Sequence, residues 1–95
     1  MYGLIVSLSV QEDQRDVFEA LVQGIARAVS ANEPDNVAYH VLRTRAQPNE
    51  YRIVEIYRSK DAFKSHLGAD YVTGTNAEVL KTLTGNPRVD VMEIV

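Results

Sequence analysis

The sequence predicts an α+β fold in the split βαβ arrangement, as a single domain over residues 1–95. Strand-like and helix-like patterns follow one another in the order strand, helix, strand, strand, helix, strand. A short polar loop, residues 46–50, joins the two middle strands and is typical of a hairpin. The later strands are apolar on both faces, unlike an antiparallel sheet with one face in water. We therefore expect an antiparallel sheet with helices on one face and a second cover on the other.

The first strand and the first helix show two different apolar periods. Alternation over residues 2–10 places five apolar residues on one strand face, namely Tyr2, Leu4, Val6, Leu8 and Val10. A spacing of three and four residues then predicts an amphipathic helix through Phe18, Leu21, Val22, Ile25 and Val29. Asp13 is the expected N-cap, and the helix should end before Pro34. Gly24 costs this helix about 1 kcal/mol relative to Ala, which favours close packing at that position.

The hairpin is expected to pair residues 37–45 with residues 51–58. The expected register places Tyr39 opposite Tyr57. Because side chains alternate along a strand, Tyr39, Tyr57 and Glu55 then share one face of the sheet.

The last third of the chain predicts two helices and a strand. Ser59 is a good N-cap for a helix over residues 60–67, and Gly68 should end that helix. A third helix is expected from about residue 70 to residue 84, followed by a final strand over residues 88–95.

Apolar residues on both faces of the later strands predict a homodimer. Ile53 and Tyr57 lie on one face of their strand, while Val54 and Ile56 lie on the other. The helices can cover only one of these faces. The simplest cover for the second face is the same sheet of another subunit, related by a twofold axis.

Composition excludes several function classes. The chain has 10 basic and 13 acidic residues, a net charge of −3, which is unlike a simple nucleic-acid-binding protein. It has no cysteine, so disulfides, iron–sulfur clusters and cysteine-based zinc sites are excluded, and its two histidines do not favour a metal centre. No apolar run approaches the ~20 residues of a membrane helix. No basic residue precedes Arg15, so we expect no signal peptide, no membrane association and a cytoplasmic protein.

Glu55 is the first candidate for chemistry. Ile53 and Tyr57 flank it on its own face. A carboxyl group there pairs with a base such as Arg43, lies in solvent near a sheet edge, or has a raised pKa.

His66 is the second candidate. It lies near the end of its predicted helix with Phe63 at helical spacing, so it points inward in one interpretation and is a structural or surface histidine in the other. The reference pKa of histidine, near 6.5, suits proton transfer. His40 has the opposite parity to Tyr39 and is expected at an interface or edge. The tyrosines, of which Tyr71 is the last, line a pocket in one interpretation and form core in the other.

Five short segments, taken together, resemble the antibiotic biosynthesis monooxygenase (ABM) family. They are Glu33-Pro34-Asp35-Asn36, Ala38-Tyr39-His40-Val41, Gln47-Pro48-Asn49, Glu55-Ile56-Tyr57 and Ala62-Phe63-Lys64-Ser65-His66-Leu67. Each is weak alone, but their order and spacing cover nearly the whole chain. The chain departs from the family pattern at two turn positions, Asp35, where Gly is usual, and Gln47, where Asp is common.

The resemblance implies a ferredoxin-like fold that forms a dimeric α/β barrel, with an apolar cavity between the sheet and the helices of each subunit. It also implies a reaction, because some family members convert quinols or anthrones to quinones with dioxygen and no cofactor or metal. A small aromatic substrate and dioxygen are then the expected partners. In this interpretation His66 is the base and Glu55 orients it or shares the proton. The residues expected to bind substrate are Tyr39, Tyr57, Tyr71, Ile53 and Phe63.

Two other activities occur in proteins of this kind. Haem-degrading relatives use a Trp and a His at positions that here hold His66 and Asn76, and the chain has no Trp, so haem degradation is not expected. A non-oxidative isomerase or ligand-binding role stays open. An isomerase of phosphorylated sugars needs cationic anchors for phosphate, for which Arg43 is a candidate.

Overall fold

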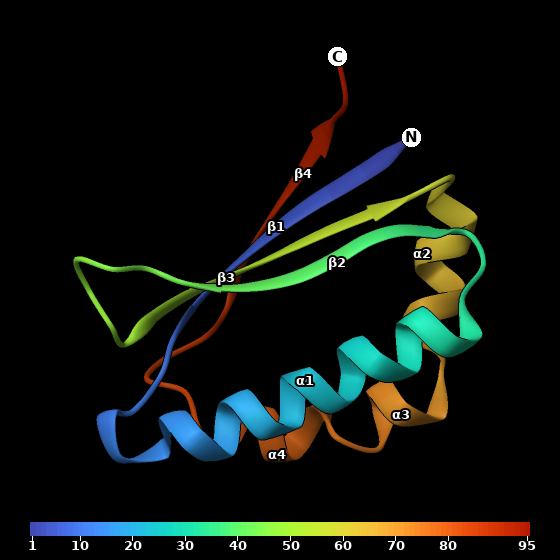
Figure 1. The fold of residues 1–95 in the computed structure, drawn as a ribbon. Coiled ribbons are helices and arrows are strands. Elements are labelled where there is room, and N and C mark those ends of the chain that lie inside the picture. The colour runs from blue at the N-terminus through green and yellow to red at the C-terminus, as the bar shows by residue number, and fades with distance from the viewer.

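A four-stranded antiparallel sheet forms the centre of the fold in the computed structural model, which describes residues 1–95. The strands are β1 (Tyr2–Ser9), β2 (Asn36–Arg43), β3 (Glu50–Tyr57) and β4 (Arg88–Glu93), in the spatial order β2-β3-β1-β4. The helices are α1 (Arg15–Asn32), α2 (Lys60–Leu67), α3 (Asp70–Thr73) and α4 (Asn76–Lys81). They all lie on one side of the sheet, and the other side carries no helix (Figure 1). The predicted ferredoxin-like α+β fold is confirmed.

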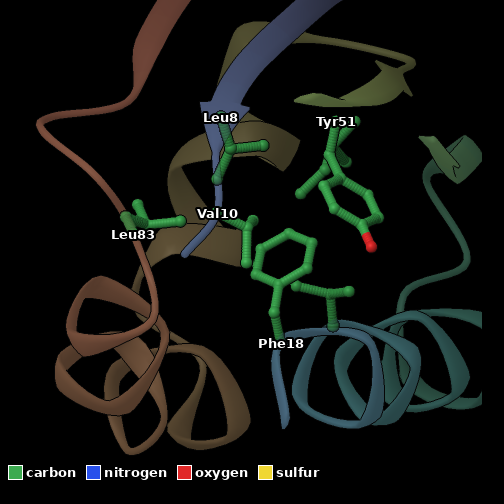
Figure 2. Close-up of a cluster of buried hydrophobic side chains, with 7 residues drawn as sticks. Leu8, Val10, Phe18, Tyr51 and Leu83 are labelled. Carbon is green, nitrogen blue, oxygen red and sulfur yellow. The ribbon is translucent and has the colours of Figure 1, made fainter. Parts of the chain in front are cut away.

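The hydrophobic core lies between α1 and the sheet. Its main cluster, drawn in Figure 2, consists of Leu8, Val10, Phe18, Val22, Tyr51, Ile53 and Leu83. The ring of Phe18 packs on the ring of Tyr51, with 4.7 Å between centroids. Four of the five residues expected on the inner face of α1 are buried, namely Phe18, Val22, Ile25 and Val29. None of the helices is long and apolar enough to cross a membrane.

The hairpin of β2 and β3 is two residues out of the expected register. Tyr39 lies opposite Glu55, and not opposite Tyr57. The loop explains the difference, because the N–H of Glu50 donates to the carbonyl of Gln47 at 2.9 Å and β3 therefore begins at Glu50, one residue earlier than expected. Since side chains alternate with a period of two, this shift keeps Tyr39, Glu55 and Tyr57 on one face.

The start of α1 also differs from the expectation of an Asp13 N-cap. A short 3₁₀ helix, Glu12–Gln14, comes first, and α1 begins at Arg15. A long-range contact sets this path, because the N–H of Gln11 donates to the carbonyl of Thr82 at 2.8 Å. A tertiary hydrogen bond, and not a local N-cap, therefore determines where α1 begins.

The single helix expected over residues 70–84 is two short helices, α3 and α4. The hydroxyl of Thr75, which lies between them, donates to the carbonyl of Tyr71 at 2.7 Å. Side-chain bonds of this kind compete with the helical ladder. Leu83 then pairs with Val10 in an isolated β-bridge, so the chain has to leave the helix before that residue.

Candidate active site

Helix α2 carries His66 to the helix-covered face of the sheet. The hydroxyl of Ser59 accepts the N–H of Ala62 at 3.1 Å, which makes Ser59 the N-cap that the sequence predicts. His66 lies three residues after Phe63, on the same face of the helix. Only 4% of His66 is exposed, so its side chain points into the molecule and does not lie at the surface.

Three aromatic rings surround the imidazole of His66. Its ring centroid lies 5.4 Å from that of Tyr57, 5.8 Å from that of Tyr39 and 6.3 Å from that of Phe63. Phe63 in turn stacks on Tyr2, with 5.5 Å between centroids. These rings shield the imidazole from water, so its interactions with nearby charges are stronger than they are at a surface.

Glu55 is a buried carboxyl group, with 6% of the residue exposed. The hydroxyl of Tyr57 donates to Glu55 Oε1 at 2.7 Å, and His66 Nε2 lies 3.7 Å from the same oxygen. Burial raises the pKa of Glu55, and the carboxylate of Glu33 also raises it, while the Tyr57 hydroxyl and His66 act in the opposite direction. The suggested pairing of Glu55 with Arg43 was wrong, because Arg43 pairs with Glu19 at 3.1 Å.

Glu33, which ends α1, holds the other side of the imidazole. His66 Nδ1 lies 3.0 Å from Glu33 Oε2 and 3.1 Å from Glu33 Oε1. The hydroxyl of Tyr71 also donates to Glu33 Oε2. An ionised carboxylate only accepts hydrogen bonds, so neutral His66 carries its proton on Nδ1 and its lone pair on Nε2.

The three tyrosines near His66 keep their hydroxyl protons at neutral pH. Burial raises the pKa of Tyr39 and Tyr57 well above the ordinary range, and the nearby carboxylate of Glu55 raises both further. Burial and the hydrogen bond to Glu33 raise the pKa of Tyr71 to about 12. These phenols therefore act as hydrogen-bond donors.

An apolar cavity of about 220 Å³ lies between the sheet and the helices; we call it the inner cavity. It has 17 lining residues, of which 13 are hydrophobic, and they come from the sheet, α1, α2, α3, α4 and the segment before β4. Its lining includes five of the predicted site residues, namely Tyr39, Ile53, Glu55, Phe63 and His66. The titratable groups in this wall are the carboxyl of Glu55, the imidazole of His66 and the phenol of Tyr39.

The other two predicted site residues, Tyr57 and Tyr71, line a second hollow of about 290 Å³, the outer pocket. It lies at the end of α1 and beside α2, where Glu33 and Asp35 also contribute. Within the chain, no group of three or more His, Cys, Asp or Glu side chains is placed to hold a metal ion. His40 is exposed, on the opposite face of β2 from Tyr39, as its parity predicts.

The sequence profile of the family described as antibiotic biosynthesis monooxygenase matches residues 1–78. The chain belongs to the antibiotic biosynthesis monooxygenase family. A search of the curated proteins found no match.

Several solved structures share the fold over almost the whole chain. A candidate antibiotic biosynthesis monooxygenase from Caulobacter crescentus CB15 is 32% identical, with a TM-score of 0.95, and the similarity covers 99% of this chain and 89% of that one. Another from Nitrosomonas europaea is 19% identical, with a TM-score of 0.93 and coverage of 100% and 99%. A Mycobacterium tuberculosis protein is 22% identical, with a TM-score of 0.90 and coverage of 99% and 94%. The last two show the shared fold alone.

Glu33 is the residue of this ABM-family site that sequence reasoning missed as a participant. It was noted only as part of a family-like segment before Pro34. A signal was available, because an acidic residue at the C-terminal end of a helix opposes the helix dipole. The hydrogen bonds of Glu33 to His66 and Tyr71 offset that cost. An acidic residue at the C-terminal end of a helix therefore indicates a hydrogen-bond donor from a distant segment.

Proposed function

We propose that this ABM-family protein is a cofactor-independent monooxygenase that oxidises a small quinol-, phenol- or anthrone-type aromatic to a quinone with dioxygen. The observation that carries the proposal is the inner cavity, an apolar space with an imidazole and a carboxyl group in its wall. The cavity suits a flat aromatic molecule, and His66 and Glu55 supply the acid–base chemistry that such a substrate needs.

In the proposed reaction His66 Nε2 takes a proton from the substrate. Dioxygen reacts slowly with closed-shell organic molecules, but a phenolate or carbanion can give it one electron, after which the two radicals combine. A naphthol with a free para C–H loses two hydrogens and gains one oxygen atom to become a naphthoquinone. The second oxygen atom leaves as water, which contains both hydrogens, so that atoms and electrons balance without a cofactor. A quinol already has both oxygen atoms, so it only loses two hydrogens, and dioxygen leaves as hydrogen peroxide.

The other site residues take roles that follow from their positions. Tyr39 lines the inner cavity, keeps its proton at neutral pH and donates to an oxygen of the substrate. Ile53 and Phe63 form apolar walls for the ring. The hydroxyl of Tyr57 is bound to Glu55, so Tyr57 positions that carboxyl group and does not contact the substrate.

The size of the inner cavity favours a substrate of two fused rings. An apolar cavity of about 150 Å³ is large enough to bind benzene. The inner cavity is about half as large again, at about 220 Å³. A naphthol or naphthohydroquinone therefore fits it better than a tricyclic anthrone.

The isomerase interpretation finds no support in this cavity. Arg43, the candidate anchor for a phosphate, pairs with Glu19 and does not line the inner cavity. No lysine or other arginine is among the lining residues. A phosphate group placed there has no cation to neutralise it.

A homodimer is part of the same proposal. The face of the sheet that carries no helix presents apolar side chains from neighbouring strands, namely Ile5, Val54, Ile56 and Met92. Met92 is 46% exposed. A second copy that packs the same face against this one buries these side chains and makes a self-complementary twofold interface.

Oxygen consumption by the purified, metal-free protein tests the proposed activity. The substrates are a naphthol, a naphthohydroquinone and an anthrone, each compared with its own autoxidation. We expect uptake above background, and we expect His66→Gln to lower kcat by about 10²-fold, because general-base catalysis contributes about that much.

The matched control is His40→Gln, which removes the exposed histidine and should leave the rate unchanged. Thermal unfolding shows whether each variant is folded. Full activity of folded His66→Gln contradicts the assignment of the base. No uptake by the wild type with any substrate contradicts the monooxygenase proposal and leaves ligand binding as the role of the cavity.

A further inference from the structure

His66 lies in the wall between two separate hollows. The inner cavity and the outer pocket have one lining residue in common, and that residue is His66. Its Nε2 lies 3.7 Å from Glu55, which lines the inner cavity, and its Nδ1 lies 3.0 Å from Glu33, which lines the outer pocket. The two ring nitrogens therefore face different compartments.

The outer pocket reaches solvent, and the inner cavity is mostly apolar. The side chain of Asp35, in the outer pocket, is 65% exposed, and that of Glu33 is 15% exposed. In the inner cavity the side chain of Glu55 is only 8% exposed. The carboxyl group on the Nδ1 side of the His66 ring thus has more access to water than the one on the Nε2 side.

The groups around the ring are carboxyl groups and phenols. Those that face His66 are Glu33 at the end of α1, Tyr39 on β2, and Glu55 and Tyr57 on β3, while Tyr71 on α3 binds Glu33. Neither hollow is lined by a lysine or an arginine, and Arg58, beside the outer pocket, pairs with Asp35 at 3.7 Å. Glu33 Oε2 accepts hydrogen bonds from both the Tyr71 hydroxyl and His66 Nδ1.

We propose that His66 and Glu33 form a proton relay between the inner cavity and the outer pocket, with Glu33 as its positioning residue; this inference rests on the proposed function. Nε2 takes the proton of the substrate, and the proton already on Nδ1 passes to Glu33. The ring stays neutral and its proton has moved from one nitrogen to the other. When the second oxygen atom leaves as water, Nε2 gives up its proton to that oxygen, the para C–H of the substrate supplies the second hydrogen, and Nδ1 regains a proton from Glu33.

The relay requires a carboxylate at position 33, so Glu33→Gln is the decisive variant. The amide keeps the shape and a hydrogen bond to the ring, but it cannot take up the proton. We expect kcat to fall about 10²-fold with KM within about twofold, because substrate contacts in the inner cavity are untouched. Glu33→Asp restores a carboxylate, and we expect it to recover part of the lost rate.

Glu19→Gln is the matched control. Glu19 also lies on α1 and accepts a tyrosine hydroxyl, that of Tyr51 at 2.5 Å, but its hydrogen bonds go to Tyr51 and Arg43, and none involves a histidine. The same change of carboxylate to amide should leave kcat unchanged there. A fall in kcat of equal size in Glu19→Gln overturns the relay, because the effect is then not specific to position 33.

A spectroscopic readout is independent of turnover. In NMR spectra of protein with isotope-labelled histidine, neutral His66 should carry its proton on Nδ1, and His40, on the opposite face of the sheet, serves as the internal reference. A proton on Nε2 of His66 overturns the relay. Glu33→Gln at the full wild-type rate overturns the relay and leaves the monooxygenase proposal intact. No oxygen uptake by the wild type overturns the proposed function, and the relay with it.

Discussion

At the residue scale, a single imidazole is held between two carboxyl groups of different burial. Glu33 lies at 3.0 Å from Nδ1 and has some access to water, whereas Glu55 lies at 3.7 Å from Nε2 and has almost none. Because desolvation disfavours a charged carboxylate, the raised pKa of Glu55 follows from its position. The two carboxyl groups that hold the ring therefore differ in their access to water.

The raised pKa of Glu55 predicts a pH dependence of stability. The folded protein retains a proton on Glu55 at pH values where the unfolded chain, with an ordinary pKa of 4.5, has lost it. The free energy of unfolding should therefore decrease as pH rises from about 4.5 through the folded-state pKa of this group. Glu55→Gln should remove this part of the pH dependence.

Urea unfolding at a series of pH values, from about 4 to about 8, measures this effect. Glu19→Gln changes a carboxylate elsewhere on the molecule. Its free energy of unfolding should show the same Glu55-dependent decrease with pH as that of the wild type. Parallel curves for the wild type and Glu55→Gln contradict the raised pKa of Glu55.

The positions of the strand residues in the site could be predicted from the sequence, but the role of Glu33 could not. Strand parity alone placed Tyr39, Glu55 and Tyr57 on one face, and an error of two residues in register did not change that. Glu33 could not be assigned from the sequence in the same way, because its contact with His66 joins the end of α1 to α2 across 33 positions. Contacts of that kind depend on how two helices pack, which no local pattern contains.

At the element scale, α1 is less closely packed at Gly24 than the sequence suggests. We expected close packing at Gly24, but a Cβ atom added there meets nothing within 4 Å. Gly24→Ala should therefore increase the free energy of unfolding by about 1 kcal/mol, because Ala has the higher helix propensity and restricts the unfolded chain.

Chemical denaturation of Gly24→Ala beside Gly74→Ala checks this prediction. At Gly74 an added Cβ atom lies 2.8 Å from the carbonyl oxygen of Asp70, so the same substitution should destabilise the protein. A loss of stability in Gly24→Ala shows that some part of the molecule does pack against that position.

Helix ends were the least predictable elements. The start of α1 depends on a bond to a distant segment, that of Gln11 to Thr82. The division between α3 and α4 depends on a side-chain bond within the segment, that of Thr75 to Tyr71. The start of α2 was predictable because its cap is local, with Ser59 bound to an N–H three residues later. A tertiary contact thus decided the start of α1, and side-chain hydrogen bonds within the segment decided the other two boundaries.

At the scale of the whole molecule, the uncovered face of the sheet predicts self-association. Val54 lies on that face near the middle of β3, between His40 on β2 and Ile5 on β1. If a second sheet packs there, Val54→Lys buries an unpaired charge in the interface and should convert a dimer to a monomer.

Sedimentation of the wild type, Val54→Lys and Val17→Lys tests the dimer. Val17 is 50% exposed on α1, away from the proposed interface, so its substitution controls for a general effect of added charge. We expect the wild type and Val17→Lys to sediment as dimers. A monomeric wild type contradicts the homodimer, although the fold and the inner cavity do not depend on it.

The central claim is that a protein with no cofactor inserts one oxygen atom into an aromatic substrate in its inner cavity. Incubation of the metal-free protein with a naphthol and isotope-labelled dioxygen, followed by mass spectrometry of the quinone, tests this claim most directly. We predict one labelled oxygen atom in each quinone molecule, formed by the wild type and lost with His66→Gln. Quinone without label, or labelled quinone formed equally fast without the protein, contradicts the account.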